Sequence, residues 1–207
     1  MKATVFSQEN IVSIPAVNET LEALFARGGG VAAVICSPHP HFAGTMHNKV
    51  ISTLTHICID QGFSTLRFNY RGVGASTGSL PTYAAAVQDA VFVKDWLHEK
   101  GFDRFIWLGF SYGGYVASFA SGITNTIALF TVAPSVAKMP YDDLPPITCP
   151  WHMIQGMQDE VIDIASNLEL AENSGCRLHK IDNASHFFHG QLSVLRETLQ
   201  PIFLDLE

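Results

Sequence analysis

One short segment combines a serine with the glycines that a nucleophile turn requires. Residues 109–113 read Gly-Phe-Ser-Tyr-Gly, directly after the apolar run 105–108 and before a stretch with helical spacing. In a sharp strand-to-helix turn, the apical serine takes a strained backbone conformation, and a Cβ atom at Gly109 or Gly113 would clash across the turn. Free N–H groups at the helix N-terminus also favour developing negative charge. The pattern predicts that Ser111 is a nucleophile, and the alternative is an incidental serine in a Gly-rich turn.

A serine hydroxyl near neutral pH needs a base, and the base needs an acid that orients it. The apolar run 151–155 ends in a loop that contains Asp159, and the next run, Arg177–Ile181, ends in a loop that contains His186. The order Ser, Asp, His, with each residue just after a strand, is the order in which these partners follow a nucleophile turn. We therefore predict a catalytic triad of Ser111, Asp159 and His186.

Neighbouring residues offer alternatives for the acid and the base. Asp182 is the second choice for the acid, and His189 is the alternative base, although it lies near the start of the last predicted helix. We expect Glu160 to point elsewhere in its tight loop and Asp163 to lie in the first turn of a helix. His152 falls within a strand and is expected to be a core histidine.

An oxyanion needs two converging backbone donors. The residue after the nucleophile, Tyr112, is predicted to supply one of them. The second should come from the loop 37–47, which reads Ser-Pro-His-Pro-His-Phe-Ala-Gly-Thr-Met-His. Pro40 has no N–H group, so the first choice for the second donor is His41 and the next is Phe42.

The same loop contains His39, His41 and His47, a set that could also suggest a metal site. A proline separates the first two, no acidic ligand is near, and the spacing H-E-x-x-H is missing. We therefore expect no metal ion. Acyl transfer by a serine triad needs no organic cofactor either.

These residues require elements that bring strand ends together. Short apolar, β-branched runs alternate with segments of helical spacing, which predicts a parallel sheet covered on both faces in a doubly wound α/β fold. The N-terminal part differs, because residues 10–14 and 20–26 predict an antiparallel hairpin around residues 15–19. The predicted strands are Val31–Cys36, 65–70, Arg104–Phe110, Thr126–Val132, 151–155 and Arg177–Ile181, and the predicted helices are 46–60, Tyr83–Glu99, 112–121, 162–173 and about 191–203.

The stretch between the strands that end near Ala133 and start near Trp151 limits what can cover the site. It has about 17 residues and contains five prolines, which exclude a long helix. We expect no lid or cap domain and a comparatively open site. Because no repeat, linker or charge block interrupts the 207 residues, we predict one domain over residues 1–207.

Composition excludes several classes of partner. Twelve Lys and Arg against 19 Asp and Glu give a net charge of −7 without a basic cluster, so nucleic-acid binding is not expected. No apolar stretch reaches the roughly 18 residues of a membrane span, and the apolar piece 3–6 is too short for a signal peptide. The four separated cysteines are expected to be buried thiols, and the expected location is cytoplasmic. These cysteines are Cys36, Cys58, Cys149 and Cys176.

The chain resembles a small, lidless α/β-hydrolase, similar to the bacterial hydrolases related to dienelactone hydrolase and short-chain carboxylesterases. The pieces that carry the resemblance span about residues 10–203, almost the whole chain. They are 38–46, 66–76, 109–114, 156–161 and 184–188. The resemblance implies an eight-stranded, mostly parallel sheet with a Ser-Asp-His triad, and it implies no particular substrate.

Two positions depart from these relatives. Dienelactone hydrolases carry a cysteine nucleophile where this chain has Ser111, so dienelactone is not the expected substrate. Many relatives have Asp where this chain has Asn69, just before the turn 71–74, Arg-Gly-Val-Gly. Arg71 is therefore expected to lack a charged partner and the turn to be held by neutral hydrogen bonds. We interpret this turn as structural, because it lacks the lysine and spacing of a phosphate-binding loop.

The predicted function is a serine hydrolase that cleaves a carboxylic ester of a small molecule, as a carboxylesterase does. Five aromatic residues flank the site and suggest an apolar pocket for the acyl or alcohol group; they are Phe42, Phe110, Tyr112, Phe187 and Phe188. A short chain without a cap favours short acyl groups. The alternatives are a thioesterase or lysophospholipase on the same triad, and a ligand-binding module without turnover. The antiparallel edge could pair in a homodimer, so the chain could be a monomer or a homodimer.

Overall fold

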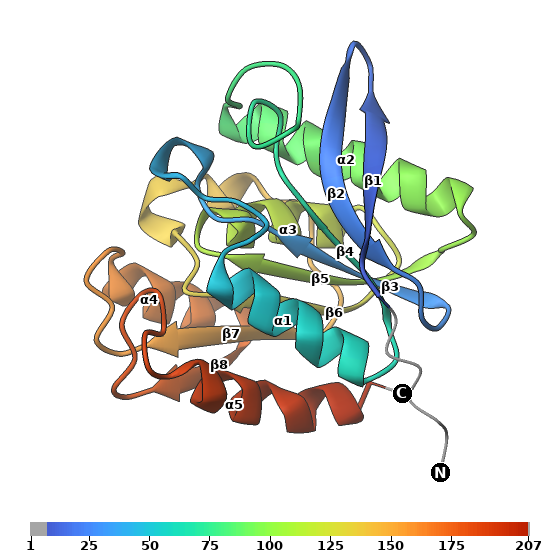
Figure 1. The fold of residues 1–207 in the computed structure, drawn as a ribbon. Helices are drawn as coiled ribbons and strands as arrows, with labels where there is room; N and C mark the ends of the chain where they lie inside the picture. The colour runs from blue at the N-terminus through green and yellow to red at the C-terminus, as the bar shows by residue number, and fades with distance from the viewer. Residues whose placement is uncertain (1–7, 207) are drawn as a thin grey trace.

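The computed structural model describes residues 8–206 and has an eight-stranded sheet at its centre (Figure 1). The strand order is β1-β2-β4-β3-β5-β6-β7-β8, and all neighbours from β4 onwards are parallel, whereas β2 runs antiparallel to both β1 and β4. The predicted doubly wound, mostly parallel sheet with an antiparallel N-terminal edge is confirmed. The strands are β1 Asn10–Ala16, β2 Glu19–Ala26, β3 Val31–Cys36, β4 Ser64–Phe68, β5 Arg104–Phe110, β6 Thr126–Val132, β7 Trp151–Gly156 and β8 Arg177–Ile181. The predicted piece 3–6 lies outside the described residues.

Within residues 8–206, five α-helices cover the two faces of this sheet. On one face α1 and α5 pack together and enclose a core that includes Phe130 and Phe203; on the other α2 and α3 pack together, and α4 lies beyond them against β7 and β8 (Figure 1). Central strands such as β5 are buried on both sides, as parallel strands between two helical layers must be. The helices are α1 Lys49–Asp60, α2 Tyr83–Glu99, α3 Tyr112–Gly122, α4 Ile164–Ser174 and α5 Leu192–Leu204.

Two helices begin later than their apolar spacing indicates, because capping residues set their first turns. Helix α1 starts at Lys49 rather than at 46, since the side chain of Asn48 accepts the N–H of Val50. Helix α4 starts at Ile164 rather than at 162, since Asp163 is the N-cap and accepts the N–H of Ser166. The expectation that Asp163 lies in the first turn is thus off by one position.

The N-terminal hairpin has longer strands and a shorter turn than predicted. Strand β1 continues through Pro15 to Ala16, and only Val17 and Asn18 connect it to β2. From the sequence, the turn of this hairpin was expected at residues 15–19. Proline is tolerated on an edge strand, and β1 is the edge of this sheet.

The segment between β6 and β7 forms only two 3-10 helices, η2 (Val136–Lys138) and η3 (Tyr141–Asp143). This agrees with the prediction that no long helix or cap is inserted there. Among the residues that the structure describes, no helix combines the length and apolarity needed to cross a membrane.

The cysteines divide into two pairs by burial. Cys36 and Cys58 are fully buried, and burial raises the pKa of both thiols. Cys149 and Cys176 are only half-buried, so the expectation of four buried thiols was wrong for these two. All four are free thiols.

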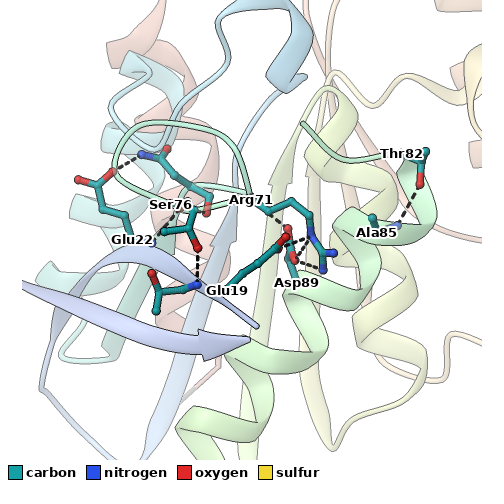
Figure 2. Close-up of polar contacts among 10 residues, drawn as sticks. Glu19, Glu22, Arg71, Ser76, Thr82, Ala85 and Asp89 are labelled. Atoms are coloured by element: carbon teal, nitrogen blue, oxygen red, sulfur yellow. Dashed lines mark hydrogen bonds and ion pairs between the residues drawn. The ribbon is translucent and has the colours of Figure 1, made fainter. Parts of the chain in front are cut away.

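The turn after β4 is held by an ion pair, which corrects the expectation of neutral hydrogen bonds. Arg71 donates through Nε to the side chain of Asp89 at 2.8 Å, and Glu19 lies 3.7 Å from the same nitrogen (Figure 2). The carboxylate of Asp89 is fully buried and also accepts the N–H of Arg71 at 3.0 Å. Asn69 is anchored separately, since its amide donates to Glu22 and its oxygen accepts the N–H of Met46.

Candidate active site

Ser111 occupies the apex of the turn between β5 and α3 with a backbone that side-chain-bearing residues rarely adopt. Its φ is 55° and its ψ is −120°. A Cβ atom on Gly109 would lie 2.0 Å from the carbonyl oxygen of Gly113, and a Cβ on Gly113 would lie 2.2 Å from that of Cys36. The two glycines therefore allow the turn to close against itself and against the end of β3.

The side chains of Ser111, His186 and Asp159 lie in one line of hydrogen bonds. His186 Nε2 is 3.1 Å from Ser111 Oγ, and His186 Nδ1 is 2.7 Å from Asp159 Oδ2. All three residues are buried. A carboxylate can only accept, so the hydrogen of His186 is on Nδ1, and Nε2 is left to accept from the serine hydroxyl. Residues from three loops, up to 75 positions apart, thus meet at the carboxyl edge of the sheet.

Asp159 is held by its own loop as well as by the histidine. Its Oδ1 accepts the N–H groups of Val161 at 2.9 Å and Ile162 at 3.1 Å. Burial raises the pKa of Asp159, but these bonds and the one from His186 outweigh it, so the pKa lies below the ordinary aspartate value. The carboxylate is therefore ionised at neutral pH.

Backbone contacts join the loop that contains Asp159 to the loop that contains His186. Met157 N–H donates to Ile181 and Gln158 N–H donates to Ala184, both at 3.0 Å. A Cβ on Gly156 would lie 2.5 Å from the Ala184 oxygen, so a larger residue would push the loops apart. Glu160 also contributes, because its Oε2 is 3.4 Å from the His186 N–H. Glu160 thus contacts the backbone of His186, whereas the two ring nitrogens pair with Asp159 and Ser111, which agrees with the expectation that Glu160 does not point to the position of the acid.

The alternative acid and base do not lie in this line. Asp182 and His189 are both exposed, and His189 stacks on Phe187 with 5.8 Å between ring centroids. His152 is buried in the core as predicted, where it stacks on Phe130 and lies 3.1 Å from His179.

The loop after β3 arranges its N–H groups differently from the expectation. Residues Pro40–Phe42 form the 3-10 helix η1. In this turn the His41 N–H donates to His39 Nδ1 at 3.2 Å, and the Phe42 N–H donates to the His39 oxygen at 3.1 Å. Both expected donors are thus engaged within their own loop.

The N–H group of His39 was not among the donors expected from the sequence. Within residues 8–206 the structure records no acceptor for it, and the ring of His39 packs on that of Tyr112 at 4.7 Å. Tyr112 is the first residue of α3, so its N–H has no partner inside the helix. The signal was present in the sequence, because Pro38 and Pro40 lack N–H groups and leave His39 as the first donor after Ser37.

The five aromatic residues expected around the site divide into core and surface. Phe110, Tyr112 and Phe188 are buried. Phe42 and Phe187 are exposed. In the described part of the chain, no group of three His, Cys, Asp or Glu side chains is arranged to hold a metal ion.

Comparisons with known proteins place this fold in a family. No protein-family model matches the chain. An α/β serine hydrolase homologue from Coxiella burnetii is 33% identical, with a TM-score of 0.88 over 94% of this chain and 97% of that one. A serine hydrolase without a lid from Xanthomonas campestris is 28% identical, with a TM-score of 0.87 over 94% and 93%. An uncharacterized protein from Rickettsia prowazekii is 30% identical over 84% of this chain and 79% of its own length. The chain therefore belongs to the α/β serine hydrolases that lack a lid.

Proposed function

We propose that the protein is a serine hydrolase that cleaves carboxylic esters with short acyl chains, in the manner of a carboxylesterase. The observation that carries this proposal is the unbroken line of hydrogen bonds from Asp159 through His186 to Ser111. The strained turn adds support, because backbone strain at a serine persists only where the surrounding structure enforces it.

The line of hydrogen bonds supports a two-step reaction. Ser111 Oγ attacks the carbonyl carbon of the ester while His186 Nε2 takes its proton, and the imidazolium then gives that proton to the leaving alkoxide. A water molecule, deprotonated by the same nitrogen, next attacks the acyl-enzyme; the acid is released, and the imidazolium returns the proton to Ser111 Oγ. Asp159 fixes the tautomer of His186 and stabilises the imidazolium in both steps.

The negative charge on the tetrahedral intermediate requires two backbone donors. We assign them to Tyr112, as expected from the sequence, and to His39 in place of His41. The rings of His39 and Tyr112 are in contact, with 4.7 Å between their centroids, which supports this pairing of donors. For the His41 N–H to serve, it would first have to give up its bond to His39 Nδ1.

The substrate class follows from what surrounds Ser111. Only two 3-10 helices stand where other hydrolases insert a cap, so little of the chain is present to enclose a long acyl tail. Thioesters pass through the same intermediate, and a lysophospholipid would present a longer acyl chain to the same atoms.

The test is hydrolysis of p-nitrophenyl esters of increasing acyl length by the wild type and by Ser111→Ala. The proposal predicts turnover that falls beyond about four carbons and disappears in the variant. Rates that stay level or rise with length would favour a lysophospholipase or thioesterase. A wild type without turnover would identify a binding module instead.

A further inference from the structure

Two buried amide side chains lie behind the loop that contains Asp159. Gln155 is on β7, one position before the strand ends, and Asn167 is on α4, which packs against that strand. Both residues are 0% exposed. A polar group that is removed from water needs a hydrogen-bond partner, because leaving it unpaired costs free energy. The partners of these two amides therefore show what they hold in place.

The two amides form a chain of hydrogen bonds that ends on the backbone of the loop. Asn167 Nδ2 donates to Gln155 Oε1 at 2.8 Å, and Gln155 Nε2 donates to the carbonyl oxygen of Gly156, also at 2.8 Å. A carbonyl oxygen can only accept, so Gln155 must turn its Nε2 toward Gly156 and its Oε1 toward Asn167. The backbone thus fixes the direction of the whole chain, and neither amide can flip without breaking it.

The carbonyl group of Gly156 also closes the turn that places Asp159. The same oxygen accepts the N–H of Asp159 at 3.3 Å, which is longer than most backbone hydrogen bonds. On the other side of this peptide group, the Met157 N–H donates to Ile181 at the end of β8. The peptide group between Gly156 and Met157 therefore joins the turn of the acid to the strand that leads to His186.

The bond from Gln155 is the shorter of the two that the Gly156 oxygen accepts. Without it the oxygen would keep only the longer bond to Asp159, and the carbonyl group would be free to rotate away from the turn. Asn167 holds Gln155 in turn, although its own Oδ1 is buried without a partner among residues 8–206. A buried oxygen without a hydrogen bond is unfavourable, so stability alone does not explain this pair of amides.

We propose that Gln155 and Asn167 are positioning residues of the triad. They fix the peptide group after Gly156 and thereby hold the carboxylate of Asp159 opposite His186. The bond from His186 Nδ1 to Asp159 Oδ2, at 2.7 Å, is the shorter of the two in the triad, and a displaced turn would lengthen it. This inference rests on the proposed function, because it gives the two amides a role in the same reaction.

The first test compares Gln155→Met and Asn167→Leu with the wild type in the hydrolysis of p-nitrophenyl butyrate. Both changes keep the approximate size of the side chain and remove its hydrogen bonds. Each should lower kcat by about 10- to 100-fold and leave KM within about twofold, because a small misplacement of a catalytic group acts on the rate of the chemical step.

Ser64→Ala is the matched control. Ser64 is also fully buried on a strand, and its Oγ bonds two backbone groups, at 2.8 and 2.9 Å. It is the first residue of β4, so it lies at the edge of the sheet opposite the triad. Its loss should lower the melting temperature and leave kcat unchanged.

The second test asks whether the amides act through the acid. Asp159→Asn has already lost the carboxylate, so the addition of Gln155→Met should lower kcat by less than about twofold further. The addition of Asn167→Leu to Gln155→Met should likewise cost little, because the two amides belong to one chain. Losses that multiply in either combination would mean that the residues act by separate routes, and would overturn the inference.

The outcomes separate this inference from the proposed function. If the wild type hydrolyses the ester and Ser111→Ala does not, but Gln155→Met and Asn167→Leu keep kcat within about threefold or raise only KM, the positioning role is wrong and the triad stands. If the wild type does not hydrolyse the ester, the rate at which a fluorophosphonate labels Ser111 replaces kcat. Slower labelling in both variants would then support the positioning role although the substrate class is wrong, and equal labelling would overturn it.

A wild type that is neither hydrolytic nor labelled would refute the proposed function and the positioning role together. Thermal melting defines the temperature at which every variant is folded, and all rates are compared there. If Gln155→Met does not fold, Asn167→Leu decides the test, because it leaves the bond between Gln155 and Gly156 available and removes only its support.

Discussion

At the scale of single residues, the carboxylate of Asp159 determines which nitrogen of His186 faces the nucleophile. Its two oxygens have separate partners: Oδ2 accepts from His186 Nδ1, and Oδ1 accepts from the backbone of Val161 and Ile162. The second oxygen is thus anchored to the loop, and the carboxylate cannot rotate without breaking those bonds. His186 is therefore held in a fixed orientation, with its acceptor nitrogen Nε2 toward Ser111.

Replacement of the acid should therefore act on the rate and leave the fold intact. Asp159→Asn keeps the shape but can donate to Nδ1, which favours the wrong tautomer, and we expect kcat to fall by about 10⁴-fold, as in a serine protease. The measurement is steady-state hydrolysis of p-nitrophenyl butyrate. Asp182→Asn is the matched control at an exposed aspartate and should leave kcat unchanged. A greater loss in Asp182→Asn would reverse the assignment of the acid.

At the residue level, the sequence allows prediction of which side chains meet where the chain order restricts their position. Ser111, Asp159 and His186 each follow a recognisable strand, and parallel strands end at one edge, so their proximity could be inferred. The proposed donor at His39 and the contact of the Glu160 carboxylate with the His186 N–H depend on how single peptide groups and side chains orient in irregular loops. Orientations of this kind in irregular loops produce no periodic pattern in the sequence, so they could not be predicted from it.

At the scale of elements, the hairpin β1–β2 and helix α2 together hold the turn that follows β4. Arg71 pairs with Asp89 from α2 and lies near Glu19 from β2 (Figure 2). The ion pair was missed because Asp89 is 18 positions further along, in a helical segment where an acidic residue is usually exposed. In this structure the carboxylate of Asp89 points from α2 toward the sheet, and Arg71 supplies the hydrogen bonds that water would otherwise donate to it.

Loss of the arginine should cost stability, because the buried carboxylate of Asp89 would be left without a counter-ion. We expect Arg71→Met to lower the free energy of unfolding by about 3 kcal/mol, as measured by urea denaturation. The double variant Arg71→Met with Asp89→Leu should recover part of that loss, since neither charge remains. A loss below about 0.5 kcal/mol in the single variant would show that the pair contributes little.

At the scale of the whole molecule, the layered sheet followed from the alternation of apolar runs and helical segments. Four of the six predicted parallel-sheet strands, including Arg104–Phe110 and Thr126–Val132, have the predicted bounds. Because such strands are buried on both faces, they have a continuous apolar sequence and can be recognised from it. The hairpin turn and the starts of α1 and α4 were less predictable, because an edge position and a capping side chain decide them.

The pH dependence of stability also belongs to the whole molecule. Burial, together with His179 and Arg177, lowers the pKa of His152 to about 4, below the value of about 6.5 in an unfolded chain. The fold therefore favours the neutral form of His152. The stability that depends on this neutral form is fully present above pH 6.5 and is lost as the pH falls toward 4. The loss should reach up to about 3 kcal/mol.

Urea denaturation at a series of pH values tests this linkage. His152→Asn, which cannot be protonated, should flatten the decline between pH 6.5 and 4, and His47→Gln, at an exposed histidine, should leave it as in the wild type. Equal slopes in all three proteins would mean that His152 is not the group that titrates.

Mass spectrometry of the protein after exposure to a fluorophosphonate, which reacts with an activated serine, tests directly whether Ser111 is the nucleophile. We predict one adduct per chain, located on the peptide that contains Ser111, and a much slower reaction in His186→Ala because the serine loses its base. A wild type that remains unlabelled, or a label that persists in Ser111→Ala, would contradict this assignment.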